Sequence, residues 1–183
     1  METLKKIFII VGSASKNSAN EKLAEILHVS LSEKFNVEIF SDLKVLPHFD
    51  PELSIQDPPQ IITQFRKTIE KADGIIICTP EYVFSIPSGL KNAIEWCIAT
   101  TVFSDKPLGI ITASASGKMG HKELKLIMKT VMANFTEETT LLIQGMKGKI
   151  GESGEIKDDK TKNDLQNFIL AFETLIYPLT KID

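Results

Sequence analysis

The chain has 183 residues, of which 43% are hydrophobic and 25% charged, so it is long enough to bury one sizeable core. This composition excludes a disordered chain, a collagen-like chain and a coiled coil. Twenty-one Lys and Arg oppose 24 Asp and Glu, giving a formal net charge of −3 without the basic stripe of a general nucleic-acid binder. We therefore expect a single domain over residues 1–183 that binds no nucleic acid.

The start of the chain and its cysteines indicate the compartment. The first apolar run, residues 7–11, is too short for the core of a signal peptide, and no stretch reaches the roughly 18 apolar residues of a membrane span. Cys78 and Cys97 form no CxxC pair and lie in apolar stretches, as small buried thiols do. We expect a cytoplasmic protein with no membrane partner.

Apolar runs and helical patterns alternate along the chain. Short apolar runs, most of them rich in β-branched residues, predict strands buried on both faces, in chain order at 7–11, 37–40, 75–78, 108–112 and 139–143. Apolar residues at helical spacing predict helices over 20–34, 61–71, 88–99, 122–132 and 164–177. Residues 42–60 form one long irregular connection, and 157–160 indicate a solvated turn and helix start.

This alternation predicts an α/β fold with a parallel sheet. Five strands with five helices fit the flavodoxin-like sheet order 2-1-3-4-5, a three-layer sandwich with the sheet in the middle. In open α/β sheets, ligands bind beyond the carboxyl ends of the strands, at the switch point. Strands 1, 3 and 4 are adjacent in this order, so we expect the loops that follow them to meet at one site.

The first of these loops, residues 12–20, is rich in Ser and Asn. A helix start there offers free backbone N–H groups and a positive dipole end, which suit a phosphate group. The loop is neither a Walker loop nor a GxGxxG turn. An ordinary turn with Ser18 or Asn20 as the helix cap explains the same residues, so both interpretations stay open.

The second and third loops offer different chemistry. Residues 79–87 hold two prolines and the aromatic side chains of Tyr82 and Phe84, which suit a flat ligand but equally a core or an interface. Residues 112–120 hold Ser and Gly, which allow a ligand to approach the backbone closely or simply form a flexible turn. The expected meeting of all three loops favours a ligand site.

The second loop also begins a specific motif. It comprises Thr79-Pro80-Glu81-Tyr82, Ser85, Pro87, Leu90-Lys91-Asn92-Ala93 and Trp96. This spacing resembles the T-P-E-Y-N-x-S-x-P…L-K-N-A-x-D-W motif of the NADPH-dependent FMN reductases. Three weaker stretches also resemble that family: Gly12-Ser13 with Ser18 and Asn20; Asp42-Leu43 with Leu46-Pro47, Phe49 and Asp50; and Lys106-Pro107 with Ser114, Gly117 and Gly120. The resemblance runs from about residue 5 to about residue 130.

The resemblance implies an enzyme that binds FMN and uses NADPH or NADH to reduce flavins, quinones, azo dyes, chromate or other small acceptors. It assigns the FMN phosphate to Ser13, Ser18 and Asn20, the isoalloxazine ring to Pro80, Glu81 and Tyr82, and the other side of the flavin to Ser116 and Gly117. Ser15 and Val83 stand where the family has Arg and Asn. Together with Phe84 and Ser114, they complete the expected cofactor-binding residues.

A bound flavin carries the hydride chemistry itself, so no catalytic side chain is required. His121, beside the third loop, could contact a pyridine-nucleotide phosphate. No His, Cys, Asp or Glu cluster has zinc spacing, so we expect no metal. The second and third loops hold few charged groups, which indicates a shallow pocket used in turn by nicotinamide and electron acceptor.

Two alternatives to the enzyme stay open. One is a flavodoxin-type electron carrier, although a net charge of −3 gives little support to a strongly acidic docking face. The other is a non-enzymatic module that binds FMN, or nothing, and acts through protein contacts. Since family members commonly associate, and since an apolar helix with Trp96 lies close to the second loop, we expect a homodimer or homotetramer.

Overall fold

The protein is described by a computed structural model that covers residues 3–151 and 154–177. Strands and helices alternate along it as the sequence predicts. In chain order the elements are β1 (Lys6–Val11), α1 (Ala19–Leu31), β2 (Asn36–Phe40), η1 (Leu43–Val45), α2 (Pro51–Gln56), α3 (Gln60–Lys71), β3 (Gly74–Thr79), α4 (Ser88–Glu95), β4 (Leu108–Ser114), α5 (Lys118–Thr130), β5 (Thr140–Gln144), η2 (Met146–Gly148) and α6 (Asp159–Ile176).

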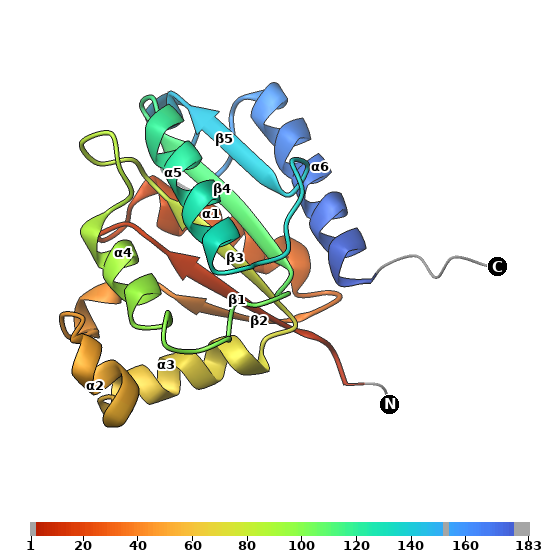
Figure 1. Cartoon of the computed structure of the whole chain (residues 1–183). Helices are drawn as coiled ribbons and strands as arrows, with labels where there is room; N and C mark the ends of the chain where they lie inside the picture. The colour runs from red at the N-terminus through yellow and green to blue at the C-terminus, as the bar shows by residue number, and fades with distance from the viewer. Residues whose placement is uncertain (1–2, 152–153, 178–183) are drawn as a thin grey trace.

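The five strands form one parallel sheet in the order β2-β1-β3-β4-β5, which confirms the predicted flavodoxin-like order. Successive side chains of β1 point to opposite faces of the sheet. On one face Phe8 and Ile10 pack in a cluster with residues of α3, α4 and α5. On the other, Ile7 and Ile9 pack with residues of α1 and α6. The helices therefore cover both faces of a central sheet, as a three-layer sandwich requires (Figure 1).

The ends of several helices differ from the sequence prediction because of local capping. The connection 42–60 is not wholly irregular: the Asp50 side chain accepts hydrogen bonds from the first turn of α2, and Pro51 occupies its first position. Helix α5 begins at Lys118, four residues early, after Gly117 in the left-handed conformation. Helix α6 begins at Asp159 rather than 164, capped by Asp158, which agrees with the helix start expected at 157–160.

The connection after β2 is fastened to α4. Pro47 O accepts hydrogen bonds from Asn92 Nδ2 at 2.9 Å and from Trp96 Nε1 at 2.7 Å. The Phe49 ring meets the Trp96 ring edge to face, with centroids 5.5 Å apart. Trp96 is fully buried, so it holds the connection beside the carboxyl edge of the sheet and offers no surface to another subunit.

Candidate functional site

The loop after β1, residues 12–18, lies directly against the end of β3. Gly12 N–H donates to Cys78 O at 2.7 Å, and a Cβ added to Gly12 would lie only 2.4 Å from Thr79 Oγ1. Only a residue without a side chain permits this approach. The two loops that follow β1 and β3 therefore start side by side, as the sheet order predicts.

Short polar contacts then fix the first loop. The Ser13 hydroxyl is buried, accepts from Ser15 N–H at 3.2 Å and lies 3.4 Å from the Tyr82 hydroxyl. Ser18 caps α1, where its Oγ accepts from Glu21 N–H at 3.1 Å. Asn17 has a left-handed φ of 54°. The capping interpretation of Ser18 thus describes its side chain in this structure.

Asn20 connects α1 to β4. Its side chain is 3% exposed, and Nδ2 donates to Ala113 O at 3.0 Å. Asn20 Oδ1 finds no hydrogen-bond donor within residues 3–151 and 154–177. Asn20 therefore joins the first helix to β4 from inside the protein.

The first and second loops enclose a cavity of about 600 Å³ at the carboxyl edge of the sheet, together with the connection after β2. Its lining residues are 11–17, Glu21, 41–45, Tyr82 and 87–89. Three of the expected cofactor-binding residues, Ser13, Ser15 and Tyr82, belong to this lining. Residues 41–45 were not assigned to the site from the sequence, although the predicted order places the end of β2 next to the end of β1.

The second and third loops are joined by two carboxylates, which we call the carboxylate clamp. The Glu81 carboxylate accepts three backbone N–H groups at the start of α5, those of Gly117 at 3.1 Å and of Met119 and Gly120 at 2.8 Å each. In the opposite direction, Glu123 Oε2 accepts from Ser85 Oγ at 2.7 Å and from Ile86 N–H at 3.0 Å. Glu81 thus occupies the positive end of the α5 dipole, where a ligand anion would otherwise bind.

Between the two halves of the clamp, the second loop makes a tight hairpin. Tyr82 N–H donates to Ser85 O at 2.9 Å and Ser85 N–H donates to Tyr82 O at 3.0 Å. The two residues at the tip have left-handed backbones, with φ of 50° at Val83 and 61° at Phe84. Their side chains are 93% and 75% exposed. The tip therefore presents two apolar groups to solvent on a backbone that disfavours both residue types.

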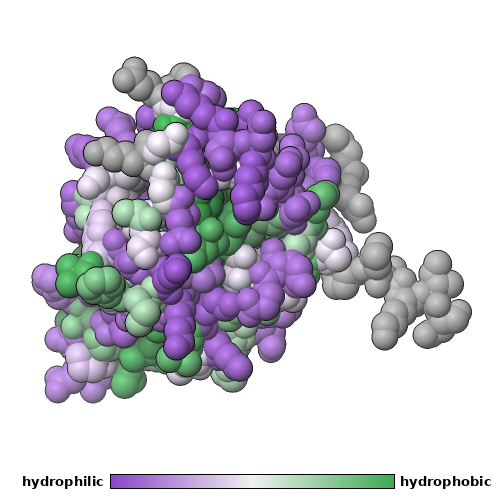
Figure 2. Space-filling model, turned by 90° about the horizontal axis from the view of Figure 1, so that it is seen from above, coloured by the Kyte–Doolittle hydropathy of each residue, from purple (hydrophilic) through white to green (hydrophobic). Residues whose placement is uncertain are grey.

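The remaining expected residues surround these contacts without lining the cavity. Pro80 is buried beside the end of β3, whereas Ser116 is exposed in the third loop. Ser114 Oγ lies 3.5 Å from Glu81 O, and Gly117 takes a left-handed φ of 80°. The three loops thus form one continuous arrangement along the edge of the sheet. Seen from above Figure 1, the surface is largely hydrophilic, with hydrophobic residues in a band across its middle and at its lower left (Figure 2).

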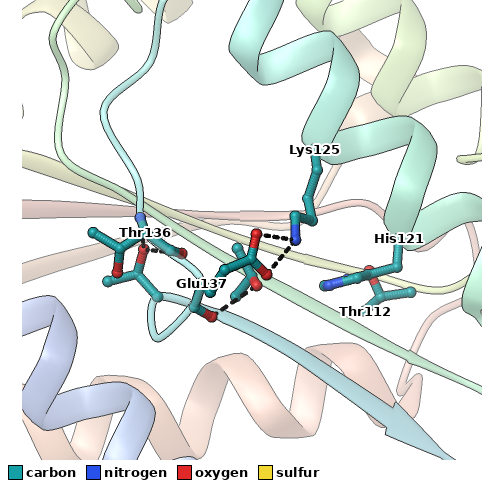
Figure 3. Close-up of polar contacts among 7 residues, drawn as sticks. Thr112, His121, Lys125, Thr136 and Glu137 are labelled. Carbon is teal, nitrogen blue, oxygen red and sulfur yellow. Dashed lines mark hydrogen bonds and ion pairs between the residues drawn. The ribbon is translucent and has the colours of Figure 1, made fainter.

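His121 lies on α5 beside the third loop, where Figure 3 shows it next to Thr112 and to an ion pair. Its Nδ1 is 2.9 Å from Thr112 Oγ1, and the pair joins Lys125 Nζ to Glu137 Oε2 at 2.6 Å. Burial, and then the Lys125 charge, lower the pKa of His121, while Glu137 opposes them. This lowered pKa favours the neutral imidazole, which disfavours His121 as a cation for a nucleotide phosphate.

The sheet order and the loops at its carboxyl edge define a flavodoxin-like protein with a cavity at the switch point. The model of the NADPH-dependent FMN reductase family matches residues 5–145, and the chain belongs to that family. It is an FMN-dependent NAD(P)H oxidoreductase, which removes the electron-carrier and non-enzymatic alternatives.

Several known proteins similar to this chain are reductases or oxidoreductases. It is 30% identical over 171 residues to the 2-hydroxy-1,4-benzoquinone reductase of Burkholderia sp, covering 90% of this chain and 92% of that protein. It is 26% identical over 181 residues to the quinone reductase of Escherichia coli K12, and this match covers 93% of this chain and 95% of that protein. Its structure resembles that of the flavoenzyme NAD(P)H:(acceptor) oxidoreductase FerB of Paracoccus denitrificans, with a TM-score of 0.77 and 27% sequence identity. The match covers 95% of this chain and 98% of FerB.

Two further findings concern the part of the chain that the structure describes. It contains no helix that is both long and apolar enough to cross a membrane. It also contains no group of three or more His, Cys, Asp and Glu side chains placed to hold a metal ion.

The chemistry of the cavity fits FMN. Hydroxyl groups of Ser13 and Ser15, loop N–H groups and the ammonium groups of Lys16 and Lys44 suit a phosphate. Tyr82 and Pro87 offer flat apolar surface for a ring system. The volume of about 600 Å³ lies within the range of small-molecule sites.

Proposed function

We propose that this cavity is the FMN site and that the protein uses it to reduce small quinones with NADPH or NADH. The observation that carries the proposal is the meeting of the Ser-rich first loop with Tyr82 around one cavity of about 600 Å³. The names of the relatives, a 2-hydroxy-1,4-benzoquinone reductase and quinone reductases, support a quinone as the acceptor. A single domain over residues 1–183 is part of the proposal.

The residues have separate tasks in this proposal. Ser13 and Ser15 hold the phosphate, and Tyr82 and Pro87 line the ring. Ser18 and Asn20 position the first loop by capping α1 and by bonding Ala113 O. When bound, FMN supplies the acceptance and donation of the hydride, which leaves binding and orientation to the protein.

Glu81 and Glu123 support the site from the side of α5. Their hydrogen bonds hold the hairpin of Val83 and Phe84 and the third loop, with Ser114, Ser116 and Gly117, beside the cavity. Few charged side chains are available there to select one acceptor. We therefore infer one shallow apolar pocket that nicotinamide and quinone enter in turn.

The FMN site itself is tested by titrating FMN into flavin-free protein and into Ser13→Ala. The hydroxyl of Ser13 is buried in the cavity lining, so its loss should weaken FMN by about tenfold, as expected for a hydrogen bond to a charged group. Thr140→Ala, at a hydroxyl on β5 outside the cavity lining, serves as the control and should leave FMN affinity unchanged. Unchanged affinity in Ser13→Ala contradicts the site.

The shared pocket is tested by steady-state kinetics with NADPH and 1,4-benzoquinone. Alternating use of one pocket predicts parallel double-reciprocal lines at several fixed quinone concentrations. Intersecting lines, with both substrates shown to bind together, contradict the shared pocket. The same assay on Tyr82→Ala and Phe84→Ala should show a larger change in quinone preference than in unfolding temperature.

We also propose that the protein acts in the cytoplasm as a homodimer or homotetramer. The exposed apolar side chains of Val83, Phe84 and Met119 support a second copy of the chain as the partner. Trp96 does not support it, because that side chain is fully buried. Light scattering at micromolar concentration tests the assembly, and a lone 20.3 kDa species contradicts it.

A further inference from the structure

A backbone N–H group of the first loop already donates a hydrogen bond to a carboxylate of the same chain. Glu21 stands in the first turn of α1, and its Oε2 accepts the Asn17 N–H at 2.6 Å. The same residue donates its own N–H to Ser18 Oγ. Glu21 and Asn17 both line the cavity. A backbone donor of the expected phosphate loop is therefore engaged by a carboxylate at the cavity wall.

A carboxylate and a phosphate cannot share this place without cost. Both seek free N–H groups at a helix start, because the donors and the helix dipole favour any anion. One N–H makes one strong hydrogen bond, so the bond to Glu21 must break before a phosphate oxygen takes that donor. A carboxylate left beside a phosphate also repels it, and water screens that repulsion only in part.

The surrounding charges do not offset the carboxylate strongly. Lys16 and Lys44 line the cavity, but both are exposed, and an exposed ammonium group contributes little through a solvated ion pair. Ser15 offers a hydroxyl at the position where the family has Arg, so the two-pronged contact of a guanidinium is missing. The Glu21 carboxylate therefore disfavours a phosphate in this cavity more strongly than it would if an arginine stood at position 15.

We propose that Glu21 is a built-in competitor of the FMN phosphate. Its carboxylate holds the first loop in shape while the cavity contains no phosphate, and it has to release the Asn17 N–H when FMN binds. This inference rests on the proposed function of the cavity. It predicts that the protein gains little affinity from the phosphate, so that FMN is bound only slightly more tightly than riboflavin and exchanges readily.

The test compares FMN with riboflavin, which has the same ring system and no phosphate. Flavin-free wild type and Glu21→Gln are titrated with each flavin, and binding is followed by flavin fluorescence. Gln keeps an acceptor for the Asn17 N–H and removes the charge. We expect Glu21→Gln to bind FMN roughly tenfold more tightly, from the loss of one close like charge, and riboflavin as wild type does.

Glu25→Gln is the matched control. It makes the same charge change one turn further along α1, on an exposed side chain outside the cavity lining. We expect it to leave both affinities close to those of wild type. Glu21→Ala, which removes the charge and the hydrogen bond together, should also tighten FMN, and it serves if Glu21→Gln folds poorly in a thermal unfolding check.

The outcomes separate the inference from the function on which it rests. If wild type binds FMN, and the ratio of FMN to riboflavin affinity is the same in Glu21→Gln, the inference is wrong and the FMN site stands. An equal gain in Glu25→Gln also overturns the inference, because it shows a general effect of charge. If neither wild type nor any variant binds FMN, the proposed function fails, and the inference fails with it.

Discussion

Val83 stands in a backbone conformation that its side chain disfavours, and relieving it should stabilise the protein. Its φ is 50°, in a hairpin closed by hydrogen bonds between Tyr82 and Ser85. A left-handed conformation costs an ordinary L-residue roughly 1–2 kcal/mol, and a branched Cβ makes it worse. Asn tolerates this conformation best among residues with side chains, and it is the residue found here in the family pattern.

The expected gain for Val83→Asn is about 1 kcal/mol in the free energy of unfolding, which corresponds to about 2–4 °C in the unfolding temperature of a chain of this length. Little packing within the chain is lost in exchange, because Val83 is 93% exposed in the single chain. Urea unfolding of the flavin-free protein measures the change. Val29→Asn, at a 72% exposed position inside α1, makes the same replacement on a helical backbone and should be neutral or slightly destabilising. A Val83→Asn variant no more stable than wild type would refute the argument from strain.

Three further predictions concern the interior and the carboxylate clamp. Glu81→Ala removes the acceptor of three N–H groups at the start of α5. It should lower the free energy of unfolding, measured in urea, by about 2 kcal/mol, a value reduced to allow for the partial exposure of Glu81. A decrease below about 0.5 kcal/mol would contradict the clamp. Asn20→Ala leaves the buried Ala113 O without its donor and should cost about 1–3 kcal/mol while weakening FMN through the first loop, checked by unfolding and FMN titration. Burial raises the pKa of Cys97 to about 12, against a smaller opposing effect of Arg66, and raises that of Cys78 further, so both thiols stay protonated at pH 8. Iodoacetamide should therefore label neither cysteine in the folded protein at pH 8 and both in urea, as mass spectrometry can show.

The sheet could be predicted from the sequence because parallel strands buried on both faces read as continuous apolar runs. Helix ends were harder, since a cap is a local contact: the start of α2 depends on the Asp50 side chain, which the many prolines of the connection obscured. The adjacency of the three loops followed from the strand order. The contacts within them did not, because Glu81 and the N–H groups of α5 are far apart in the sequence and lie together only in the fold in which β3 pairs with β4.

The same distinction explains which of the cavity-lining residues could be predicted from the sequence. Ser13 and Ser15 follow β1 directly, so the predicted strand end places them at the cavity. Glu21 and Lys44 come from the next helix and from the connection after β2, and neither carries a motif of its own. Their place in the cavity lining depends on how far a side chain reaches across the edge of the sheet, which only the folded arrangement defines.

Tyr82 connects the cavity with the hairpin of the second loop. Its side chain lines the cavity, and its hydroxyl lies 3.4 Å from Ser13 Oγ in the first loop. Its backbone closes the hairpin whose base Glu81 and Glu123 fix to α5. A movement of the hairpin would therefore displace the Tyr82 side chain and, through its contact with Ser13, the loop proposed to bind the phosphate. The left-handed residues Val83 and Phe84 form the tip of this hairpin and the clamp holds its base. If the cavity binds FMN as we propose, substitutions at the tip or in the clamp should therefore alter FMN affinity through the contact of Tyr82 with Ser13.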